Sequence, residues 1–220
     1  MLNRAASMLS LALLRLGACA LPVAAAAAAG PPAPPAKLIL AFGDSLTAGY
    51  GLPAHDGFTA QLERALAAAG DPATVHNAGI SGDTSQGGRA RLTWVLAGLH
   101  GRPDLVILEL GANDMLRGVD PTATRANLDA MLATLTQRHI PVLFAGMLAT
   151  PNLGQAYVHQ FNAIYPDLAR KYHVAIYPFF LDGAALHPEL IQADRLHPNA
   201  RGVAVIVRRM LPAVERALPR

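Results

Sequence analysis

Cysteine is almost absent from the sequence. Cys19 is the only one among 220 residues, and it lies within an amino-terminal segment that we expect to be removed. The domain that remains therefore has no disulfide and no thiol chemistry. Metal-ligand spacing is also missing, because seven of the eight histidines lack a paired ligand, so the sequence predicts no metal site. These seven are His55, His76, His100, His139, His159, His173 and His187.

Charge is scarce too. Charged residues make up 15% of the chain, and Lys37 and Lys171 are the only lysines. The formal net charge of +3 falls to +1 when residues 1–36 are left out, because that segment contains Arg4 and Arg15 and no acidic residue. This near-neutral balance gives no reason to expect a nucleic acid as partner. We interpret the arginines, which greatly outnumber the lysines, as a solvated surface.

The amino terminus has the composition of a secretory signal. Arg4 precedes an apolar stretch at residues 8–14, and small residues then dominate up to the alanine run at residues 24–29. The stretch is too short and too rich in alanine for a good membrane span. We expect residues 1–29 to form the signal peptide and residues 30–36, with four prolines, to form a linker.

The remaining residues, 37–220, are enough for one domain with a single core. A second way of processing the signal stays open, because residues 16–19, Leu-Gly-Ala-Cys, resemble a bacterial lipobox. In a lipobox the cysteine is lipidated and becomes the new amino terminus, although Arg15 is unusual within such a segment. The sequence thus predicts a periplasmic or secreted protein, or alternatively one that a lipid on Cys19 anchors to a membrane.

Residues 37–220 alternate between two hydrophobic patterns. Short apolar runs predict strands, and runs with three- and four-residue spacing predict helices. Five such alternations predict an α/β domain in which helices cover both faces of a parallel sheet. Pro166 is expected to kink or restart the fourth helix. The expected strands are residues 38–43, 73–76, 104–110, 140–145 and 174–177, and the expected helices are residues 56–69, 84–99, 120–138, 155–172 and 199–218.

Three polar or small residues follow the first three strands. Ser45, Gly82 and Asn113 come after strands one, two and three respectively. Because the carboxyl ends of parallel strands share one edge of a sheet, all three should lie at the edge where open α/β sheets place their sites. Ser45 can be a nucleophile there, or merely the N-cap of the next helix.

The other groups that serine hydrolysis needs are also present. The segment Asp194-Arg-Leu-His197-Pro offers a base and an acid on one turn, so that Asp194 can accept from His197 Nδ1–H while Nε2 faces Ser45. The side-chain amide of Asn113 and the backbone N–H groups of Ser45 and Gly82 can bind the oxyanion. The sequence Gly-x-Ser-x-Gly is absent around Ser45, which argues against an α/β-hydrolase nucleophile elbow.

Four blocks of sequence resemble, in order, those of the SGNH, or GDSL, hydrolase superfamily. They are Gly-Asp-Ser-Leu at residues 43–46, the loop of Gly82, Gly-Ala-Asn-Asp at residues 111–114, and Asp194-x-x-His197-Pro. Residues 77–85 and 110–118 resemble in particular the bacterial periplasmic thioesterase I, arylesterase and lysophospholipase group. The resemblance extends over residues 37–218.

This resemblance implies a three-layer, flavodoxin-like α/β fold whose five-stranded parallel sheet has the order 2-1-3-4-5. It implies a catalytic triad of Ser45 as nucleophile, His197 as base and Asp194 as its orienting acid. The implied oxyanion donors are the N–H groups of Ser45 and Gly82 and the side chain of Asn113. The chain departs from the group at Ala112, where a second glycine is common, and this puts the flexibility of the following loop in doubt.

Apolar residues near the expected edge suggest where an acyl chain would bind. Met115, Leu116, Met147, Leu153 and Phe179 are the candidates, and Leu148, Phe180, Leu186 and Leu190 fall in similar places. They form either an acyl groove or ordinary core, and the family resemblance favours the groove.

Other polar residues in these blocks are expected to act as supports. Asp44 should hold the turn through hydrogen bonds to backbone N–H groups, and Asp83 and Thr84 should be turn and cap residues. Asp114 should support the loop of Asn113. His187 is the weaker candidate for the base, because Ala184 stands three positions before it, where an aspartate would be needed.

These observations favour a serine esterase or thioesterase that uses no cofactor. Its partner would be a small acyl ester or thioester, with no nucleic acid and no stable protein partner, and with membrane contact only through the substrate or a lipid at Cys19. A carbohydrate O-deacetylase on the same scaffold is one alternative. A binding module that cradles an anion or nucleotide in the loop of residues 43–51 is another.

Overall fold

The computed structural model describes residues 37–219 of the chain. The expected signal peptide, with Cys19, and the expected linker lie outside the described residues.

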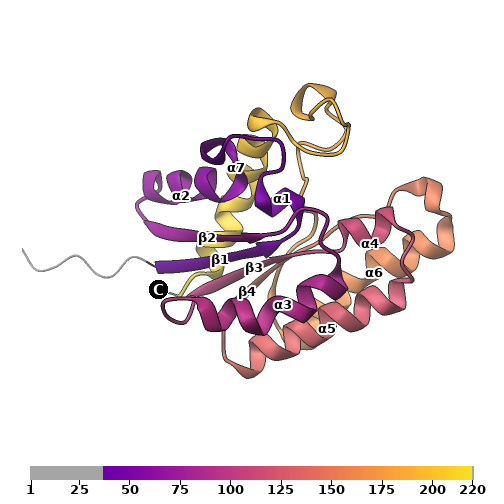
Figure 1. The fold of residues 1–220 in the computed structure, drawn as a ribbon, viewed down its shortest axis with the longest axis horizontal. Coiled ribbons are helices and arrows are strands. Elements are labelled where there is room, and N and C mark those ends of the chain that lie inside the picture. The colour runs from indigo at the N-terminus through magenta and orange to yellow at the C-terminus, as the bar shows by residue number, and fades with distance from the viewer. Residues whose placement is uncertain (1–36, 220) are drawn as a thin grey trace, which may run out of the picture. The chain divides into compact units, whose positions relative to one another are not determined.

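A five-stranded parallel sheet forms the centre of the domain (Figure 1). Its order is β2-β1-β3-β4-β5, which confirms the expected α/β fold and strand order. The strands are β1 (Lys37–Gly43), β2 (Ala73–Gly79), β3 (Leu105–Glu109), β4 (Val142–Ala145) and β5 (Ala175–Tyr177). Because all pairings are parallel, every strand delivers its carboxyl end to the same edge.

Helices cover both faces of this sheet. Helices α2 and α7 pack together on one face, whereas α3, α5 and α6 form the layer on the other (Figure 1). None of the helices within residues 37–219 is both long and apolar enough to cross a membrane. The helices are α1 (Ser45–Ala48), α2 (Phe58–Ala68), α3 (Ser85–Gly98), α4 (Ala112–Leu116), α5 (Pro121–Gln137), α6 (Gln155–Tyr172) and α7 (Ala200–Ala217). Short 3-10 turns are η1 (Ala54–Asp56), η2 (Pro151–Leu153) and η3 (Pro188–Leu190).

The sheet is buried on both faces. Ile39, Leu40, Ala41 and Phe42 of β1 are fully inaccessible, and all five residues of β3 are buried as well. Each large apolar side chain buried in this way contributes about 1.5–3 kcal/mol. The unbroken apolar runs of β1 and β3 therefore fix the centre of the sheet and the edge at which it ends, as their sequence predicts.

The structure differs from the sequence-based expectation in three places. Strand β2 runs on to Gly79, three residues further than expected, because it pairs with β1 as far as Gly43. Helix α6 continues through Pro166 without a restart, since apolar side chains on both sides of the proline are buried against the core. Helices α1 and α4 were not expected, because four or five residues are too few to give a helical pattern.

Candidate active site

Ser45 lies where β1 turns into α1. The N-cap of α1 is Asp44, whose side chain accepts a hydrogen bond of 3.0 Å from the Leu46 N–H. Ser45 is thus the first helical residue rather than the cap, and its hydroxyl is free for another role. Only 8% of Ser45 is exposed, so the hydroxyl lies in a recess at the edge of the sheet.

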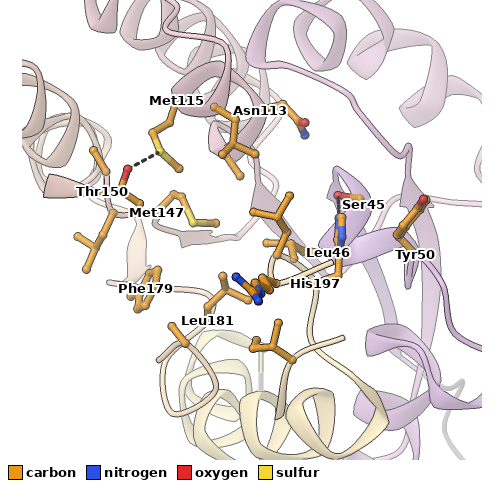
Figure 2. A pocket seen from close by; sticks show the side chains of 18 of the residues that line it. Ser45, Leu46, Tyr50, Asn113, Met115, Met147, Thr150, Phe179, Leu181 and His197 are labelled. Atoms are coloured by element: carbon orange, nitrogen blue, oxygen red, sulfur yellow. Dashed lines mark hydrogen bonds between the residues drawn. The ribbon is translucent and has the colours of Figure 1, made fainter. Parts of the chain in front are cut away.

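A histidine and an aspartate are aligned with this hydroxyl. His197 Nε2 lies 2.8 Å from Ser45 Oγ, and His197 Nδ1 lies 2.6 Å from Asp194 Oδ2. Figure 2 shows the imidazole of His197 directed at Ser45. The structure therefore brings together, across 152 positions of sequence, the three residues that the sequence analysis selected.

Asp194 is held in its ionised form by the turn that carries His197. Desolvation raises its pKa, but hydrogen bonds from the Leu196 N–H and from the ring and backbone N–H of His197 outweigh it and lower the pKa to about 2. The two backbone bonds end on Asp194 Oδ1, at 2.9 and 3.1 Å, which leaves Oδ2 for the imidazole. This arrangement fixes Nδ1 as the protonated nitrogen and leaves Nε2 as an acceptor facing Ser45.

Two residues that the sequence analysis did not single out hold the histidine turn. The ring of Tyr50 lies 4.6 Å from that of His197, centroid to centroid, in a tilted arrangement. Gln192 Nε2 donates to the backbone oxygens of Tyr50 and Pro198, at 2.8 and 2.9 Å. Gln192 thereby connects the loop after α1 to the loop before α7. An isolated Tyr or Gln in a loop gives no sequence signal of such a role.

Three N–H groups at this edge of the sheet are available to a ligand beside Ser45. The first N–H of α1, that of Ser45, has no carbonyl within its own helix to bind. The N–H of Gly82 makes no hydrogen bond within residues 37–219, and Gly82 has a φ of +82°, a left-handed conformation that suits glycine. Asn113 donates one Nδ2–H to Asp44 Oδ2 at 3.2 Å, which leaves the second for a ligand.

Arg91 of α3 fixes the loop of Gly82 to the end of β1. Its Nε contacts Asp83 Oδ2 at 2.7 Å, while its two terminal nitrogens donate to the carbonyl oxygens of Ala78 and Gly43. The guanidinium also lies 4.0 Å from the centroid of the Phe42 ring. Arg91 is therefore not part of a solvated surface, as the arginines were interpreted to be, because its charge and donors are used within the fold.

Asp114 connects three helices behind Asn113. It is 1% exposed, and its carboxylate accepts from the N–H and hydroxyl of Ser85 on α3 and from the hydroxyl of Thr124 on α5. The expected supporting role of Asp114 is thus confirmed. Thr84 also caps α3 as expected, since its hydroxyl accepts from the Gly87 N–H.

An apolar pocket of about 580 Å³ opens beside Ser45 (Figure 2). It contains four of the five predicted acyl-binding residues, Met115, Leu116, Met147 and Phe179, together with Leu148 and Leu186. Leu153, the fifth, does not line this pocket, because it packs against the core from the outer end of η2. Phe180 and Leu190 are likewise buried in the core rather than in the pocket.

The second His-Pro dipeptide lies elsewhere. His187 Nδ1 is 3.3 Å from Glu189, both side chains are more than half exposed, and His187 does not line the pocket. Nowhere in residues 37–219 do three or more His, Cys, Asp or Glu side chains come together as possible metal ligands.

Comparison with known proteins agrees with this geometry. The model of the GDSL-like lipase/acylhydrolase family matches residues 41–205, so the chain belongs to that family. An arylesterase of Vibrio mimicus is 41% identical over 161 residues, which are 73% of this chain and 80% of that protein. Thioesterase 1/protease 1/lysophospholipase L1 of Escherichia coli (strain K12) is 38% identical over 164 residues, 74% and 76% of the two chains. The crystal structure of AlinE4, an SGNH-hydrolase family esterase, superposes with a TM-score of 0.71 at 49% identity, covering 84% of this chain and 98% of that one.

Proposed function

We propose that the protein is a serine hydrolase that cleaves carboxylic esters and thioesters through an acyl-enzyme on Ser45. The observation that carries this proposal is the unbroken line from Ser45 Oγ to His197 Nε2 and from His197 Nδ1 to Asp194. Membership of the GDSL-like family and the esterase and thioesterase names of its relatives support it. The chemistry requires no cofactor and no protein partner.

The first half of the reaction forms the acyl-enzyme. His197 Nε2 takes the proton of Ser45 as Oγ attacks the acyl carbonyl carbon, and the ionised Asp194 stabilises the imidazolium that results. The tetrahedral oxyanion is bound by the N–H groups of Ser45 and Gly82 and the free amide N–H of Asn113. Collapse of this intermediate expels the alcohol or thiol, which leaves with the proton from His197.

The second half regenerates Ser45. With the leaving group gone, His197 Nε2 takes a proton from water, and the resulting hydroxide attacks the acyl carbonyl at the same oxyanion site. The acid is released when Ser45 Oγ recovers its proton from His197. Tyr50, whose ring lies tilted against the imidazole, stabilises its positive charge in both halves.

The proposed substrates share an acyl chain rather than a leaving group. The pocket beside Ser45 offers Met115, Met147 and Phe179 to an apolar chain, whereas the leaving group would face the open side of the site. Aryl esters, acyl thioesters and lysophospholipids all meet this description.

A fluorophosphonate probe tests the proposed chemistry. We expect covalent labelling of the wild-type protein and its loss in Ser45→Ala. Ser81→Ala is the matched control, because Ser81 lines the same pocket without contacting the histidine, and it should be labelled like the wild type. An unlabelled, folded wild-type protein would reject the enzyme and favour the anion-binding module.

Chain length separates an acyl hydrolase from a carbohydrate O-deacetylase. We expect hydrolysis of p-nitrophenyl esters to favour acyl chains longer than acetyl, because the pocket is large and mostly apolar. Strict preference for acetyl would support the deacetylase instead.

We also propose that residues 1–29 direct export, so that the domain acts in the periplasm or outside the cell. The support is compositional: a short apolar stretch followed by small residues. Metabolic labelling with a radioactive fatty acid distinguishes this from anchoring at Cys19. An unlabelled mature protein is expected, and a labelled one that becomes unlabelled in Cys19→Ser would establish the lipid anchor.

A further inference from the structure

Glu109, the last residue of β3, is a buried carboxyl group that neither the triad nor the oxyanion site uses. It is fully inaccessible, and its Oε2 accepts from the Asp44 N–H at 3.1 Å and from Thr47 Oγ1 at 2.8 Å. Gly43 has to be glycine here, because a Cβ at that position would lie 2.4 Å from Glu109 Oε2. Glu109 is therefore built into the turn that presents Ser45.

The second carboxyl group of this turn lies against the first. Asp44 is also fully inaccessible, and the hydrogen bond from its backbone N–H to Glu109 Oε2 at 3.1 Å places the two carboxyl groups in the same buried turn. A hydrogen bond between two carboxyl groups requires a proton on one of them. Glu109 Oε1 is the oxygen that can carry this proton, because no N–H or O–H group within residues 37–219 donates to it.

No cation pairs directly with either carboxyl group at this place. Among the described residues neither carboxylate forms an ion pair, and Arg91 binds the carbonyl of Gly43 instead. His197 is directed at Ser45, and the remaining titratable neighbours, Tyr165 and Asp114, bring no positive charge. Two adjacent, uncompensated carboxylates cannot both stay ionised in a buried site.

The two carboxyl groups differ in pKa, and this decides which one keeps the proton. Burial and the adjacent charge of Asp44 raise the pKa of Glu109 well above its usual 4.5. Burial also raises the pKa of Asp44, but hydrogen bonding with the Leu46 N–H, Glu109 and Asn113 and the charge of His197 hold it to about 6. Asp44 is thus the member that ionises first.

We propose that Glu109 is a positioning residue that stays protonated, donates a hydrogen bond to the Asp44 carboxylate, and through Asp44 holds the Asn113 amide at the oxyanion position. Asp44 Oδ2 accepts from Asn113 Nδ2 at 3.2 Å, so the chain of contacts from the core to the oxyanion site is continuous. The retained proton leaves one negative charge behind that site instead of two. The role of Asn113 in this inference rests on the proposed function, whereas the retained proton does not.

Thermal unfolding between pH 5 and 8 tests the proton. A carboxyl group whose pKa is raised on folding stabilises below its unfolded pKa and loses that stability as pH rises. Glu109→Gln removes this loss and keeps the hydrogen bonds, so the Tm of the variant minus that of the wild type should rise by about 3–5 °C per pH unit. Glu215→Gln, at an exposed position, is the control, and its Tm minus that of the wild type should not change with pH. A Tm difference between Glu109→Gln and the wild type that does not change with pH would overturn the proposal.

Ester hydrolysis tests the positioning. Glu109→Gln should keep kcat at pH 8 within about threefold, because its amide both accepts from Thr47 and donates to Asp44. Glu109→Leu, which lets Asp44 and Asn113 move, should lower kcat by about 10- to 100-fold with little change in KM. A folded Glu109→Gln that loses as much kcat as Glu109→Leu would overturn the proposal. Absence of hydrolysis by the wild type would instead reject the proposed function, and the unfolding experiment would still decide the proton.

Discussion

The two sides of the active site are built in opposite ways. On the nucleophile side, Asp44, Thr47 and Glu109 are all at most 1% exposed and lie against the sheet. On the base side, the Asp194 side chain is 33% exposed, and neighbouring Leu196 is half exposed. Both sides must nevertheless hold one atom each, Ser45 Oγ and His197 Nε2, 2.8 Å apart.

The two sides differ in how far apart in sequence their hydrogen-bonded residues lie. Hydrogen bonds on the nucleophile side join Asp44 and Thr47 to Glu109, more than 60 positions away in sequence. On the base side, Asp194 binds Leu196 and His197, two and three positions away. Substitutions on the nucleophile side should therefore lower stability and activity together, whereas those on the base side should lower activity with a smaller loss of stability.

The base itself should give the largest effect and should leave the fold intact. We expect His197→Ala to lower kcat by about 10⁵- to 10⁶-fold and Asp194→Ala by about 10³- to 10⁴-fold, since the orienting acid only holds and stabilises the base. His187→Ala is the control and should retain full activity. Steady-state kinetics with a p-nitrophenyl ester, alongside Tm, measures both. Loss of activity in His187→Ala rather than His197→Ala would reassign the base.

Asp114, which supports the loop of Asn113, should affect stability and activity together. Asp114→Ala removes a buried acceptor of three hydrogen bonds, so we expect about 3 kcal/mol of lost stability together with reduced kcat. Asp120→Ala, at the exposed N-cap of α5, should cost about 1 kcal/mol and leave kcat unchanged. Urea unfolding and kinetics on both variants make the comparison. Equal loss of kcat in the two would contradict it.

The two sides should also respond to pH in opposite directions. The pKa of Asp194 is lowered from 3.8 to about 2, so its contribution to stability is present above pH 4 and is lost as pH falls toward 2. We expect the Tm of the wild type minus that of Asp194→Asn to be constant from pH 5 to 7 and to shrink below pH 4. A difference that persists undiminished at pH 2 would show that the ionised form of Asp194 is not what matters.

An exposed contact on the oxyanion side should give the smallest effect. Arg117 Nη2 donates to the Gly82 carbonyl oxygen at 2.7 Å, which joins the loops of the two proposed oxyanion donors Gly82 and Asn113. Arg117→Ala should lower kcat by about 3- to 10-fold while changing stability by less than about 0.5 kcal/mol. Arg89→Ala, which removes an exposed contact to Asn127, is the matched control. An unchanged kcat in Arg117→Ala would mean that the sheet alone positions Gly82.

Most of the fold could be predicted because its patterns are local. The apolar runs of β1 and β3 and the spaced apolar residues of α5 are readable within a few residues, and their alternation predicts a parallel sheet. The order of the strands was implied by the family resemblance instead. The end of β2 could not be predicted, because Asn77 and Gly79 are turn-forming residue types that only pairing with β1 keeps in a strand. The unbroken helix at Pro166 likewise depends on packing from outside the helix.

The sequence by itself determined the candidates for the proposed catalysis: Ser45, Asn113, Asp194 and His197 follow strand ends or share one turn, and motif spacing is enough to find them. Tertiary structure alone decided what supports them. Arg91, Tyr50, Gln192 and Glu109 carry no local signal, because their partners lie on other strands and loops. A buried carboxyl such as Glu109 reads in sequence as the polar end of a strand, and only the fold brings it against a second carboxyl and removes the water that would let both ionise.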